Sequence, residues 1–400
     1  MIPMQQHFDS VTYALGNVEI AAQMEQVRPL PVFSEEACAF LSALSARILK
    51  DAEAKAFPDV MTLGFWCRPA ALRQMYRVYE AEKNRIGRGI VFHIAPSNVA
   101  VNFAYSCLAA FLAGNASVVR LPSKDFPQVD VLCRIFAQTL AEFPALFPYF
   151  LFVRYGHVQD VTEHYSRLAN TRVIWGGDAT IEAIRRAPLA PRANEITFAD
   201  RHSLAVLEAD AYLAAADKAR IAQDFYNDTY LSDQNACTAP HFVIWLGTAV
   251  AAAQEVFWNA LHEVVGARYT MQAVQAVDKL TQLYRLGACF EVRQVPAEDN
   301  LITRVRVAKL TEEMTAYRAG SGFFIEYRAQ KLAEIRPLCG ISCQTLSCYG
   351  VQRDALLQEI LAMRPAGVDR IVPLGRTMDF ALVWDGVDLI RTMSRVVQVI

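Results

Sequence analysis

The sequence has almost no excess of charge of either sign. Its 39 Lys and Arg residues against 41 Asp and Glu residues give a net charge of -2. Without a basic surplus, neither a nucleic acid nor an acidic membrane surface is expected as a partner. Internal repeats and low-complexity linkers are also missing, and 54% of the residues are hydrophobic. These features exclude a disordered chain and predict a compact protein of two or three domains.

Paired cysteine motifs are absent, although the chain has nine cysteines. The number is odd, no CxxC pair occurs, and none of the seven histidines stands at a zinc-like spacing from a cysteine. The opening stretch MIPMQQHFDS is polar and does not resemble a signal peptide. We therefore expect a reduced, cytoplasmic protein without a bound metal.

One uncharged run, residues 99–119, is long enough to span a bilayer. However, Asn102 and the pair Gly114-Asn115 interrupt it, and Arg120 follows directly. We predict a buried helix that ends at Gly-Asn, followed by a buried strand, rather than a membrane span.

Strand-like and helical segments alternate from Gly89 onward. The strand patterns are GIVFHIAP, ASVVRLP, YFLFVRY and RVIWGG, and a helical pattern follows each of them. This alternation predicts a doubly wound parallel sheet. The stretch SLAVLEA continues the strands. A second α/β unit then follows, with a helix over 217–230, a strand over 241–246 and a helix over 249–265.

Cys237 lies in the polar stretch YLSDQNACTAPHF, between a helix and a strand. A cysteine acts as a nucleophile in its thiolate form, and a loop can expose the sulfur to a substrate. The polar neighbours Asp233, Gln234 and Asn235 make a fully buried packing role less typical here. The alternative is a small apolar residue at a helix end.

Asn98, in IAPSNVA, follows the first strand of the regular pattern. Ligands bind at the carboxyl ends of parallel strands, and a side-chain amide there can donate to a developing oxyanion. The alternative is that Asn98 caps a helix that starts near Val99.

Several motifs, in this order, are similar to those of aldehyde dehydrogenases: IAPSNVA, FLAGNASVVRLPSKD, VIWGGD and DQNAC. More closely, FADRHSLAV, DQNACTAPH, CQTLSCYG, VDRIVPLGR and VWDG resemble the bioluminescence-type (LuxC-like) acyl-CoA reductases, the fatty acid reductase subunits of luminous bacteria and their relatives. The resemblance covers roughly residues 85–400. It implies an α/β, aldehyde dehydrogenase-like fold. Its parts would be a Rossmann-type NADP-binding domain over 1–206, a catalytic domain over 207–375, and a C-terminal strand segment over 376–400 that returns to the first domain or contacts another subunit.

The resemblance also implies roles for single residues. Cys237 falls on the nucleophile and Asn98 on the oxyanion-hole asparagine. The implied cofactor-binding residues are Pro96, Ser123, Lys124, Gly176 and Gly177. The later E-x-F-G-P motif, whose glutamate contacts the cofactor ribose, has no evident counterpart.

Two departures from the superfamily pattern indicate the cofactor and the direction of the chemistry. Lys124 replaces the glutamate that binds the ribose hydroxyls, and an ammonium attracts the 2′-phosphate of NADPH. Thr197 replaces the glutamate that serves as base for hydrolysis, and a threonine hydroxyl cannot accept a proton at neutral pH. We therefore expect NADPH-dependent reduction of a long-chain fatty acyl-CoA, or of an acyl-protein thioester, to a fatty aldehyde.

The resemblance further implies an acyl-protein synthetase as a partner, and a homo-oligomer. Two other functions remain open. His202 or His241 paired with Cys237 would make a Cys–His acyltransferase or thioesterase. A subunit that binds an acyl group without catalysis is the non-enzymatic alternative.

Overall fold

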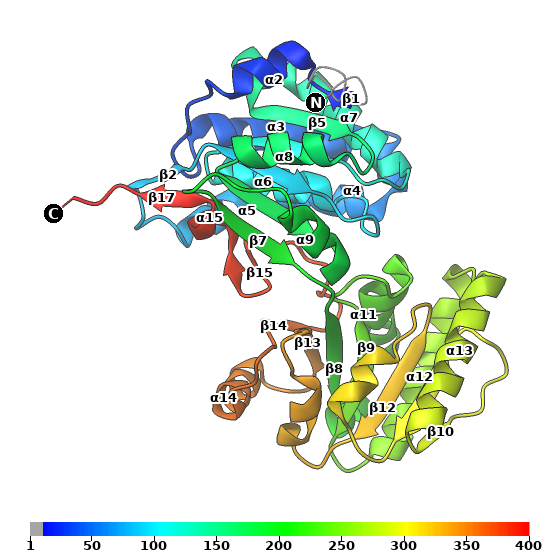
Figure 1. Ribbon diagram of the computed structural model, residues 1–400. Helices are drawn as coiled ribbons and strands as arrows, with labels where there is room; N and C mark the ends of the chain where they lie inside the picture. The colour runs from blue at the N-terminus through cyan, green and yellow to red at the C-terminus, as the bar shows by residue number, and fades with distance from the viewer. Residues whose placement is uncertain (1–10, 400) are drawn as a thin grey trace. The chain divides into compact units, whose positions relative to one another are not determined.

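The structure is a computed structural model that describes residues 11–399 (Figure 1). The chain forms two compact units. The first comprises residues 11–199 and 380–399, and the second is Asp200–Asp379. Each unit is built on its own largely parallel sheet.

The first unit holds a six-stranded sheet in the order β1-β5-β4-β3-β6-β7. Its strands are β1 (Thr12–Leu15), β3 (Ile90–Ile94), β4 (Ala116–Arg120), β5 (Phe150–Arg154), β6 (Thr171–Trp175) and β7 (Asn194–Phe198). All pairs from β5 to β7 are parallel, and β1 runs antiparallel along β5. Strands β3 and β6 are buried along their whole length, as in sheets covered on both faces. The predicted strand–helix alternation is confirmed.

The helices of the first unit begin and end at recognisable signals. The Ser34 hydroxyl accepts a hydrogen bond from the N–H of Ala37 at the start of α3, whose first turn is acidic and whose last turn is basic. Proline stands in the first turn of α4, α5 and α7, where its missing N–H costs nothing. The helices are α2 (Val18–Met24), α3 (Glu35–Lys50), α4 (Pro58–Trp66), α5 (Pro69–Arg77), α6 (Asn102–Leu112), α7 (Pro127–Leu140), α8 (Gln159–Leu168) and α9 (Asp178–Arg185).

The uncharged run at 99–119 forms α6 and β4, which confirms the predicted helix and strand. Every residue of α6 is buried, because the helix packs against β3, β4, α3 and the C-terminal helix α15 (Leu389–Thr392). Gly114, between α6 and β4, has a φ of +88°. This left-handed conformation favours glycine and ends the helix. Within residues 11–399, no helix is both long enough and apolar enough to cross a membrane.

The second unit holds a seven-stranded sheet in the order β10-β11-β12-β9-β8-β13-β14. Its strands are β8 (His202–Glu208), β9 (Pro240–Leu246), β10 (Val292–Gln294), β11 (Thr303–Val307), β12 (Phe323–Arg328), β13 (Cys343–Tyr349) and β14 (Arg370–Pro373). Only β10 is antiparallel to its neighbour. A domain boundary after residue 206 would cut through β8, which pairs with β9 and β13. The chain divides at Ala199 instead. The sequence did not reveal this boundary, because an apolar parallel strand has the same sequence pattern whichever sheet it joins.

The helices of the second unit lie close to their expected positions. The Asp217 carboxylate accepts a hydrogen bond from the N–H of Arg220 at the start of α11. A single turn of 3-10 helix, η3 (Tyr230–Ser232), follows α11 directly. The helices are α10 (Ala209–Ala214), α11 (Lys218–Thr229), α12 (Val250–Arg268), α13 (Ala273–Cys289) and α14 (Arg353–Met363).

The C-terminal segment rejoins the first unit at Phe380, slightly after the expected boundary at residue 376. It contains β15 (Val383–Trp384), β16 (Val387–Asp388), α15 and β17 (Ser394–Val396). Strand β17 pairs antiparallel with β2 (Arg85–Gly87), and the two lie side by side in Figure 1. The buried Asn115 amide donates to the Met393 carbonyl at 2.9 Å and fixes the returning chain.

Candidate active site

The order of strands in the first unit creates a point where ligands bind in open parallel sheets. From β3 the chain builds β4 and β5 on one side, and then β6 and β7 on the other. The direction therefore reverses between β3 and β6, and the crevice outside the carboxyl ends of two such strands is the usual ligand site. The loop after β3 carries Pro96 and Asn98, and the loop after β6 carries Gly176 and Gly177. These four predicted residues thus flank one switch point.

Asn98 is exposed and is not the N-cap of the following helix. Helix α6 begins at Asn102, its N-cap is Val101, and no side chain accepts a capping hydrogen bond there. The alternative role as a cap at Val99 is therefore wrong, since the chain turns through three further residues before the helix starts. Pro96 is buried at the end of β3, where it holds the loop that presents Asn98.

Ser123 and Lys124 lie in the loop after β4, and both are exposed. The Lys124 ammonium lies 5.1 Å from the centre of the Phe126 ring, in a cation–π contact. It stands at the carboxyl edge of the sheet, next to the loop that carries Asn98. A cation here can meet an anionic group of a ligand without a cost of burial.

The glycines after β6 leave open backbone at the same edge. A Cβ at Gly177 would meet no atom within 4 Å, whereas one at Gly176 would lie 3.1 Å from Thr180. Gly177 is the N-cap of α9 and has an ordinary extended conformation that any residue can adopt. The absence of a side chain at this position therefore leaves room beside the backbone and is not needed for the conformation. This open backbone, with Ser123 and Lys124 nearby in the sheet order, fits a dinucleotide that lies across the carboxyl edge.

The turn before Cys237 is fixed by a buried amide. Gln234 is 1% exposed, with a φ of +58°. Its Nε2 donates to the carbonyls of Pro240 and Phe323 at 2.8 and 3.1 Å, and its Oε1 accepts from the N–H groups of Gly322 and Phe323 at 2.9 and 3.1 Å. All hydrogen-bonding positions of this amide are therefore satisfied. Gln234 is therefore polar because its buried amide holds the turn by these four hydrogen bonds, and not because it lies in an exposed loop.

Cys237 itself is partly exposed, just before β9. Its sulfur accepts a hydrogen bond from Nε2 of Gln344 at 3.3 Å, and its carbonyl accepts one from the Ser203 hydroxyl at 2.7 Å. Ser203 comes from β8 and Gln344 from β13, which are neighbouring strands. The thiol thus stands at the amino edge of the second sheet, held by two adjacent strands. Sequence reasoning missed Gln344, and its only signal was a polar residue inside the apolar strand CQTLSCY.

Most other thiols are unsuited to nucleophilic attack. Cys67, Cys107 and Cys133 are buried, and burial raises the pKa of Cys67 well above its usual value and those of Cys107 and Cys133 to about 12. Cys38 is half-buried, and burial raises its pKa as well. Cys289 is exposed, and its sulfur lies 3.2 Å from the Tyr317 hydroxyl.

The two histidines proposed as partners of Cys237 have other hydrogen-bond partners in the structure. His202 Nε2 donates to the Leu338 carbonyl at 2.9 Å, and its Nδ1 faces the Ser342 hydroxyl at 3.3 Å. His241 Nδ1 lies 3.2 Å from the Ala319 carbonyl. Burial lowers the pKa of His202 to about 4 and that of His241 to about 3. Such weakly basic rings are poor general bases at neutral pH.

Thr197 lies in β7, opposite Ile174 of β6, and is half-buried.

No group of three or more His, Cys, Asp or Glu side chains in residues 11–399 is arranged to hold a metal.

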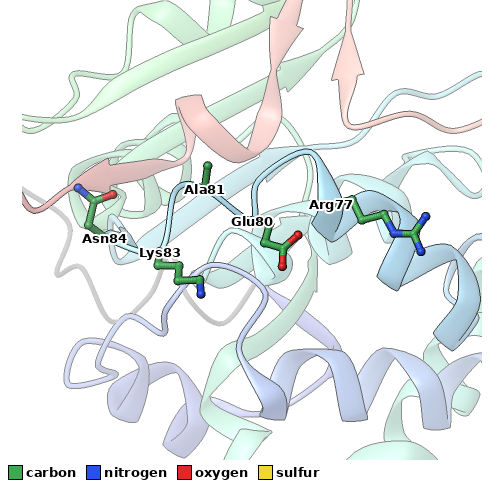
Figure 2. Close-up of a pocket in the computed structure, with 5 residues that line it drawn as sticks. All are labelled: Arg77, Glu80, Ala81, Lys83 and Asn84. Atoms are coloured by element: carbon green, nitrogen blue, oxygen red, sulfur yellow. The ribbon is translucent and has the colours of Figure 1, made fainter.

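A surface hollow of about 700 Å³ lies on the first unit, and none of the candidate residues lines it (Figure 2). It is lined by Arg77, Glu80, Ala81, Lys83 and Asn84, from the end of α5 and the segment that leads to β2. The lining is charged and open rather than apolar and enclosed, unlike a typical ligand pocket. We therefore do not place the active site there.

Comparisons with known proteins agree with this architecture. Similar structures include a putative aldehyde dehydrogenase from Burkholderia cenocepacia, with a TM-score of 0.64, 15% identity, and coverage of 94% of this chain and 90% of the other. Lactaldehyde dehydrogenase from Escherichia coli gives 0.62 and 15%, with coverage of 94% and 87%. The R100A mutant of Thermus thermophilus 1-pyrroline-5-carboxylate dehydrogenase gives 0.61 and 16%, with coverage of 95% and 85%. These likenesses establish an aldehyde dehydrogenase fold.

No curated protein matches the chain. At the level of families, residues 17–274 match the description "Acyl-CoA reductase (LuxC)". This match covers more than half of the 400 residues and includes Asn98, Lys124, Gly177 and Cys237. The chain therefore belongs to the LuxC family of acyl-CoA reductases and is an oxidoreductase with the aldehyde dehydrogenase fold.

Proposed function

We propose that the protein reduces a long-chain fatty acyl thioester to a fatty aldehyde, with NADPH as reductant, through an acyl group carried on Cys237. The observation that carries the proposal is the Cys237 thiol. It is partly exposed, it follows a rigidly clamped turn, and a side-chain N–H points to its sulfur at 3.3 Å. A donor to sulfur favours the thiolate, which is the reactive form.

The residues of this chain account for each transfer. The Cys237 thiolate attacks the acyl carbon, the bond from that carbon to the sulfur of CoA breaks, and the released CoA thiolate takes up a proton. The Asn98 amide donates to the oxyanion, a type of contact whose removal typically costs about 10²–10³ in rate. Bound NADPH supplies the hydride that reduces the acyl carbon. The thiohemiacetal on Cys237 then collapses to the aldehyde and returns the thiolate.

The carboxyl edge of the first sheet supplies the cofactor contacts. We assign them to Pro96, Ser123, Lys124, Gly176 and Gly177 in the loops after β3, β4 and β6. Lys124 favours NADPH because its ammonium pairs with a 2′-phosphate. Among the similar structures, a 1-pyrroline-5-carboxylate dehydrogenase from Thermus has bound NAD, and a 3,6-anhydro-L-galactose dehydrogenase is in complex with NAP, that is, NADP. The fold therefore admits either nucleotide.

A thioesterase or Cys–His acyltransferase fits the residues less well. The low basicity of His202 and His241 disfavours proton removal by either ring, and Thr197 supplies no base. The acyl group is therefore expected to wait on Cys237 for the reductant. We propose acyl-CoA as the donor, with an acyl-protein synthetase as an alternative donor, and a homo-oligomer as the working form.

The proposal is tested by mixing the protein with NADPH and a long-chain acyl-CoA. We expect loss of the nicotinamide absorbance, release of free CoA thiol and formation of aldehyde in equal amounts. Cys237→Ala should abolish all three, and Cys289→Ala, which removes the exposed thiol, should leave them unchanged. Thiol release without NADPH loss would indicate transfer or hydrolysis instead, and neither signal would indicate a binding protein.

A further inference from the structure

Gln344 is a buried amide inside an apolar strand, with its side chain directed at the sulfur of Cys237. It is fully buried, at the start of β13, and its main-chain carbonyl accepts a hydrogen bond from the Asp369 N–H at 2.8 Å. Its Nε2 lies 3.3 Å from the sulfur, and its Oε1 accepts from the Thr345 hydroxyl at 3.3 Å. A buried amide is costly unless its groups are paired, so this position is built for its contacts.

We propose that Gln344 is a catalytic residue of the acyl reduction, whose amide N–H stabilises the Cys237 thiolate. The inference rests on the proposed function. The same contact serves twice: when the thiolate attacks the acyl carbon, and when the carbon–sulfur bond of the thiohemiacetal breaks and its electron pair returns to sulfur. No net proton is transferred to or from Gln344 in either step.

The Gln344 amide has one end toward the sulfur and the other toward Thr345. The Ser203 hydroxyl donates to the Cys237 carbonyl at 2.7 Å and accepts from the Thr345 N–H at 3.2 Å. The Thr345 hydroxyl donates to Oε1 of Gln344, and Nε2 lies on the side of the sulfur. With the amide reversed, its oxygen would face the sulfur and would favour the neutral thiol. The two orientations predict opposite effects of removing the amide.

Alkylation of Cys237 tests the contact without substrate or cofactor. The full-length protein and Gln344→Met, which keeps the length of the side chain and loses the donor, are treated with iodoacetamide across a range of pH. The rate at Cys237 is read by peptide mass mapping. We expect the midpoint of the profile to rise by about one to two pH units in Gln344→Met, because hydrogen bonds to charged groups have that order of strength. In Gln344→Glu, a carboxylate faces the sulfur, and the rise should be larger.

Cys289 gives an internal control in the same digests, because its profile should not move in either variant. An unchanged midpoint in Gln344→Met, or a lower one, would overturn the proposal. Acylation of Gln344→Met by acyl-CoA should be about 10- to 100-fold slower at pH 7 and should recover at alkaline pH. Recovery by pH separates thiolate stabilisation from structural damage. If Cys237→Ala is still acylated, the proposed function fails, whereas the alkylation profile still reports on the contact.

Discussion

At the scale of single residues, the proposed chemistry depends on two positions at which this chain differs from the aldehyde dehydrogenase pattern. The resemblance to the superfamily predicts that Thr197 takes the place of its catalytic base and Lys124 that of its ribose-binding carboxylate. Both lie in the first unit, one within β7 and the other in the loop after β4. Each changes a single interaction, so each can be reversed by one substitution.

Thr197→Glu should convert part of the reduction into hydrolysis. A positioned base typically contributes about 10²–10⁴-fold to the attack of water. We expect the acylated variant to release free fatty acid in buffer without NADPH, whereas Thr197→Val should retain its acyl group as the unaltered protein does. The decay of labelled acyl-enzyme measures both. Equal decay in Thr197→Glu and Thr197→Val would mean that position 197 does not face the acyl group.

Lys124→Glu should reverse or erase a preference for NADPH. One charge-assisted hydrogen bond is worth about 1.5–3 kcal/mol, or tenfold and more in kcat/KM. Lys124→Met keeps much of the side-chain length and should reduce the preference without favouring NADH. Steady-state kinetics with both cofactors give the ratios. Equal kcat/KM for NADPH and NADH in the unaltered protein would remove this role for Lys124.

Sequence reasoning predicted the positions of Cys237 between a helix and a strand and of the candidate cofactor loops after β3, β4 and β6, because local patterns mark where strands end. It did not find the contacts of Gln234 and Gln344. Gln344 meets Cys237 from 107 positions away, and Gln234 meets Phe323 from 89 positions away. Such pairs depend on the order of strands in the sheet, which no local pattern encodes. The sequence pattern placed Gln234 in a polar loop, because a polar residue type does not show whether the side chain is exposed to solvent or buried and hydrogen-bonded.

At the scale of elements, the turn between η3 and β9 is the support of the thiol. Asp233 and Gln234 both have a φ above +50°, which non-glycine residues rarely adopt. The Gln234 amide offsets this strain with its four hydrogen bonds, and the Tyr269 hydroxyl donates to the Asp233 carboxylate at 2.6 Å. The sequence predicted the flanking helix and strand well, but gave no sign of this backbone conformation.

Gln234→Leu should therefore destabilise the second unit by several kcal/mol. Each buried backbone group left without a partner costs about 1–3 kcal/mol. As a control, Gln223→Leu alters a partly exposed amide on α11 that donates to Asn227 and accepts from Arg268, and it should change the free energy of unfolding little. Urea unfolding measures both variants. A loss below about 1 kcal/mol in Gln234→Leu would show that the turn holds its shape without the clamp.

At the scale of the whole molecule, both units bury titratable groups that link stability to pH. His93 in the first unit is fully buried between the hydroxyls of Ser106 and Ser117, at 2.8 and 3.2 Å. Burial lowers the pKa of His93 to about 3. In the second unit, burial also lowers the pKa of His202, to about 4, and that of His241, to about 3. The native state thus keeps these rings neutral, whereas the unfolded chain binds protons near pH 6.5.

Stability should consequently be lost as pH falls below about 6.5. A neutral buried histidine contributes a slope of up to about 1.4 kcal/mol per pH unit between its unfolded and folded pKa values. His93→Asn, which does not titrate, should show a smaller loss of unfolding free energy between pH 6.5 and 5 than the unaltered protein. Urea unfolding of the first unit at the two pH values tests this. The same loss in both proteins would mean that His93 is not held neutral.

The alternation of strands and helices was sufficient to predict two α/β units, and the resemblance of the motifs supplied the aldehyde dehydrogenase-like class. The boundary between them was placed several residues late, because β8 reads like any buried parallel strand. The C-terminal segment rejoins the first unit through contacts with Asn115 and β2. These contacts join residues that lie far apart in the sequence, so no local pattern predicts them.

The central claim is that Cys237 carries an acyl group that waits for hydride. The most direct measurement loads the protein with labelled long-chain acyl-CoA, removes the excess, and divides the sample between buffer alone and buffer with NADPH. The account predicts that peptide mapping finds the label on Cys237, that the label persists in buffer, and that NADPH releases it rapidly as aldehyde. Label on another residue, or rapid release of fatty acid in buffer alone, would contradict the account.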